Sequence, residues 1–136
     1  NPVEYSGIYS TQNALLDRVI TINLEHWDRE TEIKITMAQV DLSFEDAKKI
    51  VSIVRNFRKK AGVNISIRAA VMIGRMVKSL NLDIKPENRL FVKMCEDILL
   101  GRAEIDNYDT AGGGFSTESA SNSIEQIIRG IVPGIR

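Results

Sequence analysis

The stretch from Ser43 to Gly62 constrains the fold more than any other part of the sequence. Ser43 and Asp46 approximate a capping box at its start, and Gly62 suits the residue that closes a helix. Between them, large apolar residues recur at helical spacing, with basic and polar residues on the opposite side: Ala47, Ile50, Val51, Val54 and Phe57. A helix with one apolar face needs other elements to cover that face. The stretch therefore predicts an amphipathic helix packed inside a larger helical body.

Three further helices are predicted around this one. The first covers residues 29–40 and follows Asp28, a favourable N-cap. Another starts after Ser66 and runs through Leu80, and the last begins at Pro86, a favoured first helical residue, and ends at Gly101. Gly74 costs about 1 kcal/mol relative to alanine inside a helix, so we expect it to serve close packing. Because the connections are short, the four helices are predicted to form a compact bundle.

The two ends of the sequence differ from this helical middle. Residues 1–12 are typical of a loop, a helical turn ends at Arg18, and residues 19–24 favour a strand that is buried on at least one face. From residue 104 onward, Gly, Ser, Thr and Asn become frequent, which predicts a flexible tail. The segment 124–129 is amphipathic and forms either a weak terminal helix or a peptide that docks on another chain.

The predicted fold is therefore mainly α, in three parts. Residues 1–26 form the edge of an α/β core, residues 27–103 form the helical bundle, and residues 104–136 form the flexible tail. The sequence opens with Asn1-Pro2 and has no initiating methionine, so we expect a fragment or a processed piece of a longer protein.

Charge and composition narrow the classes of function. Lys plus Arg (18) equals Asp plus Glu (18), which argues against broad electrostatic capture of nucleic acid or of an anionic membrane. The single cysteine, Cys95, excludes an internal disulfide and favours a reducing, cytoplasmic setting. No apolar run is long enough to span a bilayer. No Cys or acidic cluster with metal-ligand spacing surrounds His26, so no metal site is predicted.

Two arginines stand out as candidates for phosphate recognition, and each has an alternative interpretation. Arg18 lies at a helix-to-strand junction, where it either pairs with Asp17 on the surface or presents its charge to a phosphate; the residues alone favour the pair. Arg68 lies in the first turn of a helix, where the helix dipole disfavours a cation. Either an anion lies nearby or the long side chain reaches solvent or a carboxylate, and the residues alone leave this open. Gly112 to Gly114 lack the remainder of a phosphate loop and are interpreted as linker.

The order of these parts resembles the C-terminal part of a ring-forming AAA+ ATPase. It is similar to the branch that contains the MoxR-type and CbbQ/NirQ-type chaperone ATPases. The resemblance is closest to the gas vesicle protein N family and covers roughly residues 1 to 100. It rests on Asn-Pro-Val-Glu-Tyr-Ser-Gly (1–7), Thr-Gln-Asn-Ala-Leu-Leu-Asp-Arg (11–18), Asp-Arg-Glu-Thr-Glu-Ile (28–33) and Ile-Arg-Ala-Ala-Val-Met-Ile-Gly-Arg (67–75).

The resemblance implies roles for three residues. Asn1 occupies the place of the sensor-1 polar residue, which helps to orient the attacking water, and is thereby a catalytic candidate. Arg18 matches the arginine finger, a catalytic residue that reaches the nucleotide of the neighbouring subunit. Arg68 matches the sensor-2 arginine, which binds the nucleotide of its own subunit. The chain has no Walker A loop and no Walker B strand. ATP and Mg²⁺ are therefore expected to be bound mainly by an upstream part, and this chain alone is expected to be inactive.

The expected function is that of an ATP hydrolase whose ring, of hexameric size, supports gas vesicle assembly. The implied partners are copies of the same chain and gas vesicle structural or accessory proteins, in the cytoplasm and associated with the vesicle. One alternative is a MoxR- or CbbQ-type chaperone that activates a metalloenzyme. The other is a non-catalytic helical interaction module that has kept the bundle and lost the motor.

Overall fold

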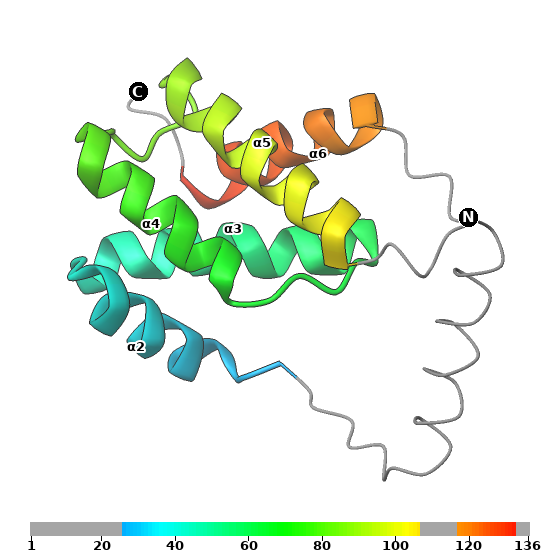
Figure 1. The fold of residues 1–136 in the computed structure, drawn as a ribbon. Helices are drawn as coiled ribbons and strands as arrows, with labels where there is room; N and C mark the ends of the chain where they lie inside the picture. Colours follow the sequence, from blue (N-terminus) through cyan, green and yellow to red (C-terminus); the bar gives the residue numbers. More distant parts are fainter. Residues whose placement is uncertain (1–25, 107–116, 133–136) are drawn as a thin grey trace, which may run out of the picture.

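A computed structural model describes residues 26–106 and 117–132, and these residues form a bundle of helices (Figure 1). No strand occurs in these two ranges. The predicted loop 1–12, the strand 19–24, Asn1, Arg18 and the glycines 112–114 lie outside the described residues. The bundle consists of α2 (Arg29–Val40), α3 (Phe44–Ala61), α4 (Arg68–Leu80), α5 (Arg89–Asp106) and α6 (Thr117–Ile131). The prediction of a mainly α fold is confirmed.

The predicted caps of α2 and α3 are present. The Asp28 carboxylate accepts a hydrogen bond from the Thr31 backbone N–H at 2.7 Å, and the Ser43 hydroxyl accepts one from the Asp46 N–H at 3.2 Å. Gly62 ends α3 in the left-handed conformation, with φ at 66°. Both helices therefore begin and end where their local sequence directs.

Gly74 has the packing role that the sequence suggests. A Cβ on this residue would lie 2.9 Å from Leu42 Cδ1 and 3.3 Å from Val40 Cγ2. The absence of a side chain on α4 thus allows the end of α2 and the short α2–α3 connection to approach closely. The approach compensates for the intrinsic cost of glycine in a helix.

The predicted bounds of α5 are wrong at both ends. Pro86 does not open the helix but lies in the preceding turn, and Asn88 caps the helix by accepting the Phe91 N–H at 3.3 Å. At the other end, the helix continues through Gly101 to Asp106. A glycine ends a helix when it turns left-handed, and Gly101 keeps a negative φ. Residues 104–106 therefore belong to the helix and not to the tail.

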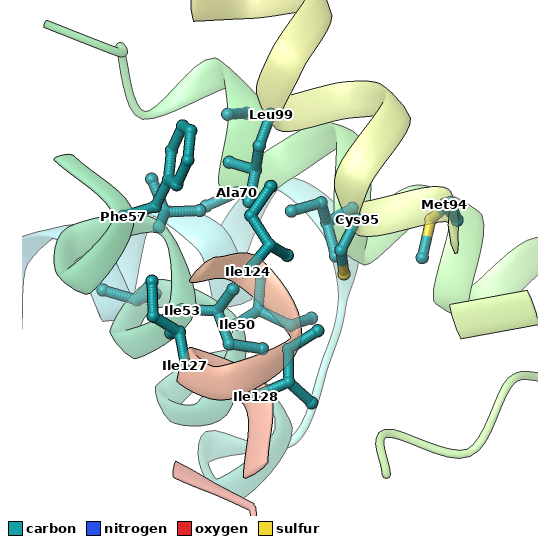
Figure 2. Packing of buried hydrophobic residues seen from close by; sticks show 14 of the residues in the cluster. Ile50, Ile53, Phe57, Ala70, Met94, Cys95, Leu99, Ile124, Ile127 and Ile128 are labelled. Atoms are coloured by element: carbon teal, nitrogen blue, oxygen red, sulfur yellow. The ribbon is translucent and has the colours of Figure 1, made fainter. Parts of the chain in front are cut away.

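The prediction of a flexible tail also needs correction for residues 117–131, which form α6. This helix packs against α3 and α5. Val132 directly follows the helix and is buried in the common core together with the apolar residues of α6 that follow helical spacing: Ala120, Ile124, Ile127 and Ile128. Figure 2 shows Ile124 and Ile128 gathered with Ile50 of α3 and Cys95 and Leu99 of α5. Burial of this stripe outweighs the weak helix propensity of the neighbouring Ser, Thr and Asn residues.

The core lies around α3, which contacts α2, α4 and α6. The largest fully buried side chains of the core are Phe57 on α3 and Phe91 on α5. Cys95 of α5 is fully buried in this core. Burial raises the pKa of its thiol far above the usual value, so it behaves as a small apolar residue.

Candidate functional site

Arg68 is the one sequence-predicted site residue that the described part of the chain contains. It is the first residue of α4, and its side chain is exposed. Asn1 and Arg18 fall in the range 1–25, outside the described residues, so their predicted roles stay predictions.

The N-terminus of α4 carries uncompensated positive charge. Its N-cap residue is Ile67, which has no side chain able to cap, and the first turn contains no acidic residue. The Ser66 hydroxyl accepts a long hydrogen bond of 3.3 Å from the Arg68 N–H. The helix dipole and the guanidinium of Arg68 therefore add to a positive potential at this point. Such a helix end favours a bound anion.

A pocket of 390 Å³ opens beside this helix end, between α2, α4 and α5. Three guanidinium groups line it, those of Arg68, Arg75 and Arg102. Arg102 donates hydrogen bonds to the Met72 Sδ at 3.0 and 3.3 Å. A thioether is a weak acceptor, so most of the donor capacity of Arg102 remains available to a ligand. The pocket thus gathers three positive charges from two helices.

No Asp or Glu balances these charges among the described residues that line the pocket. None of the three arginines forms an ion pair with a described carboxylate. Guanidinium groups present planar donor pairs that match phosphate and carboxylate oxygens. The chemistry of the pocket therefore fits an anion with several oxygen atoms.

The rest of the pocket wall is largely apolar. Ile35 of α2 and Ile67, Val71 and Met72 around the start of α4 contribute the apolar surface, and Gln39 adds an amide. A pocket that combines an apolar wall with a few convergent polar groups is typical of small-molecule sites. This combination suits a ligand with an apolar part and an anionic part.

A buried ion-pair network fixes α2, which supplies Ile35 and Gln39. The Glu32 side chain is 1% exposed, and its two oxygens accept hydrogen bonds from Arg58 Nη1 and Nη2, both at 2.8 Å. Arg55 donates a further bond to the same carboxylate. Burial works to raise the pKa of Glu32, but the hydrogen bonds and charges of Arg58 and Arg55 outweigh it and hold the pKa below its usual value. The carboxylate therefore stays ionised and ties α2 to α3.

Sequence reasoning missed Arg75 and Arg102 as members of the site. Arg75 could have been predicted from the sequence, because a residue seven positions after Arg68 returns to the same face of a helix. Arg102 comes from α5, and no local pattern connects it to Arg68. Only the packing of α4 against α5 brings these side chains together.

Two searches of the described residues give negative findings. Among residues 26–106 and 117–132, no three His, Cys, Asp or Glu side chains gather as a group able to hold a metal ion. Within the same ranges, no helix has the length and hydropathy that crossing a membrane requires.

Comparison with curated proteins finds relatives that share one name. The chain is 36% identical over 103 residues to the Gas vesicle ATPase GvpN of Haloferax mediterranei, and 34% identical over 104 residues to that of Ancylobacter aquaticus. Each match covers 75% of this chain. The Gas vesicle ATPase GvpN1 of Halobacterium salinarum is 31% identical over 126 residues, which is 92% of this chain. The chain is therefore similar to these ATPases over most of its length.

The matches cover only a part of each relative. They span 29% of the first two proteins and 35% of the third, so the chain spans about a third of the length of the relatives it matches. No family model and no solved structure matches the chain.

Proposed function

We propose that this chain is the nucleotide-sensing helical region of an AAA+ ATPase that supports gas vesicle assembly. Two findings support the proposal. The chain is similar over most of its length to proteins named gas vesicle ATPases. The observation that carries it is the pocket at the start of α4, where three arginines converge with no described carboxylate in the lining. In this proposal, the bundle is the lid of the ATPase.

The pocket would bind the phosphates of a nucleotide held by the same subunit. Arg68 contacts the phosphate oxygens, and Arg75 and Arg102 stabilise the same charge from the side. Because α2, α4 and α5 all contribute to the pocket, a bound phosphate would hold these helices against the nucleotide-binding core. Loss of the terminal phosphate would weaken that attachment and allow the lid to move, which couples hydrolysis to mechanical change.

Arg18 and Asn1 complete the proposed catalytic arrangement. As an arginine finger, Arg18 neutralises the charge that develops on the phosphoryl group in the neighbouring subunit, and Asn1 helps to orient the attacking water. Arginine fingers contribute about 10³ to 10⁵ in rate in enzymes that use them. The donor set of the pocket fits the phosphates of ATP but offers no acidic ligands for Mg²⁺, so we derive no step for the metal from the described residues.

The proposed active form is a ring of identical subunits, because the finger acts across a subunit boundary, and we propose that the ring is a hexamer. Its clients are gas vesicle structural or accessory proteins, and the site of action is the vesicle in the cytoplasm. A MoxR- or CbbQ-type chaperone would bind nucleotide in the same pocket but act on a different client protein. A non-catalytic module would keep the bundle but show neither nucleotide binding nor turnover in the measurements that follow.

The two roles separate in measurements on the intact protein. Arg68→Gln is expected to weaken nucleotide affinity, because it removes a charge-assisted contact, while Arg18→Ala is expected to leave affinity nearly unchanged and abolish most turnover. Lys60→Gln is the control for loss of one exposed charge, since Lys60 lines neither this pocket nor the one described below. Identical nucleotide titrations for Arg68→Gln and Lys60→Gln would refute the pocket assignment. Unchanged turnover of Arg18→Ala would refute the finger.

A further inference from the structure

A second cationic pocket lies on another face of the bundle and shares no lining residue with the pocket of Arg68. Its volume is 690 Å³, and it is open to solvent. It is formed by the start of α2, the C-terminal half of α3 and the loop that follows α3. The proposed ATPase role makes no use of this pocket.

Four cationic side chains line it, namely Arg29, Arg55, Arg58 and Lys59. Arg29 donates from Nη2 to the Ser52 hydroxyl at 2.9 Å, which holds its guanidinium at the pocket wall. The side chain of Arg58 is only 8% exposed, and its Nε donates to the backbone carbonyl of Ile65. Arg29 and Arg58 are therefore held in position before any ligand arrives, which lowers the entropic cost of binding.

The nearby negative charge is already committed. Glu32 is the carboxylate that contacts this group, and its two oxygens accept hydrogen bonds from Arg55 and Arg58. No Asp or Glu occurs among the described residues that line the pocket itself. The exposed carboxylate of Asp28 also interacts with Arg55 through its charge, so the four cations face two carboxylates, and the remaining positive charge is open to a ligand.

Helix dipoles explain only a part of this surplus. Arg58 and Lys59 lie in the last turn of α3, where a cation complements the negative end of the helix. Arg29 lies in the first turn of α2, where the dipole disfavours a cation, and Arg55 lies outside the last turn of α3. The ion pair with Glu32 accounts for the position of Arg55, whereas Arg29 forms no ion pair with a described carboxylate and would gain a charge partner from an external anion.

We infer that this pocket binds an oligophosphate, that is, a small molecule with a diphosphate or triphosphate group. Four cations against the carboxylates of Glu32 and Asp28 leave a surplus of two positive charges, which matches the charge of such a group better than that of a single carboxylate. The guanidinium of Arg58 is already occupied by Glu32 and the Ile65 carbonyl. Arg29, Arg55 and Lys59 are therefore the groups that would contact the phosphate oxygens. The concave shape suits a small molecule. The inference does not depend on the ATPase assignment, because the two pockets have no residue in common.

The test is a titration of the full 136-residue chain with inorganic pyrophosphate, followed through backbone amide shifts in NMR spectra. The amides of Asn56, Gly62 and Asn64 are expected to shift, because these residues line the pocket. Lys59→Gln is expected to weaken the affinity about tenfold, because it removes one charge-assisted contact. Lys60 is the neighbouring residue on the same helix but does not line the pocket. Lys60→Gln should therefore change the affinity less than twofold, because salt screens the charge of an exposed residue that does not contact the ligand.

Three further arms make the outcome decisive. Equal effects of Lys59→Gln and Lys60→Gln would overturn the inference, as would shifts confined to Val71 and Met72 in the pocket of Arg68. A tetraglutamate peptide that binds as tightly as pyrophosphate would also overturn it, since the site would then select charge and not phosphate. A titration with ATP distinguishes a nucleotide from a free oligophosphate as the source. Arg68→Gln should leave pyrophosphate binding here unchanged, which separates this test from that of the proposed function.

Discussion

Replacing Glu32 by alanine is expected to destabilise the bundle strongly, because the substitution breaks a buried ion pair. The side chain is 1% exposed and lies between two arginines of α3. The substitution removes the carboxylate and leaves the guanidinium of Arg58, which is 8% exposed, buried without its charge partner. Arg55 is 35% exposed, so water can solvate its guanidinium after the loss.

The expected magnitude follows from the burial of Arg58. Breaking a buried ion pair by removing one partner costs about 3–5 kcal/mol, because the remaining charge is uncompensated. Arg58 keeps its hydrogen bond to the carbonyl of Ile65, which places the expected loss toward the lower end of that range. Replacing both partners together, as Glu32→Leu with Arg58→Met, should recover much of the loss, because a well-packed apolar pair avoids the desolvation cost.

Urea denaturation followed by circular dichroism measures the free energy of unfolding for each variant. Glu30→Ala is the matched control, since Glu30 lies in the same helix turn and forms an exposed pair with Lys34. Its removal should cost less than about 1 kcal/mol. A loss below about 1 kcal/mol for Glu32→Ala, equal to that of Glu30→Ala, would show that the Glu32 network does not hold α2 to α3.

Three further predictions concern pH, the last helix and the glycine contact. Because the folded-state pKa of Glu32 lies below its ordinary value of 4.5, the stability it contributes is present above that pH and is lost as the pH falls through the folded-state pKa. Acid titration of stability should show a smaller pH dependence in Glu32→Gln, and an identical profile would contradict this. Ile128→Ala should lower the free energy of unfolding by about 2–5 kcal/mol, whereas exposed Gln126→Ala should change it by less than about 0.5 kcal/mol. Equal melting curves would mean that α6 is not part of the core. Gly74→Val should cost about 1–3 kcal/mol through overpacking against Leu42, and an increase in thermal stability would contradict the close contact.

Local sequence cues predicted α2, α3 and α4 well because all of the determinants lie inside each segment. The cap at Ser43, the apolar stripe and Gly62 specify α3 without reference to any other part of the chain. The same kind of cue gave the wrong start for α5, because Pro86 is compatible with both a turn and a first helical position. The hydrogen bond from the Phe91 N–H to Asn88 decides between the two, and the sequence pattern alone does not contain that choice.

Determinants that come from other helices could not be predicted in this way. The apolar stripe of α6 becomes a structural element because α3 and α5 provide the surface that it covers. Glu32 lies in the first turn of α2, and its burial as an ionised group depends on Arg55 and Arg58 of α3. The position of Arg68 at a helix start was readable from the sequence, whereas its neighbour Arg102 required the packing of α5.

The most direct test of the account is a structure of the intact protein with a non-hydrolysable ATP analogue. The account predicts that the guanidinium of Arg68 lies within hydrogen-bond distance of a phosphate oxygen, with Arg75 and Arg102 facing the same group. A structure in which the nucleotide is bound, while these three arginines face solvent away from it, would contradict the assignment of this bundle as a nucleotide-sensing lid.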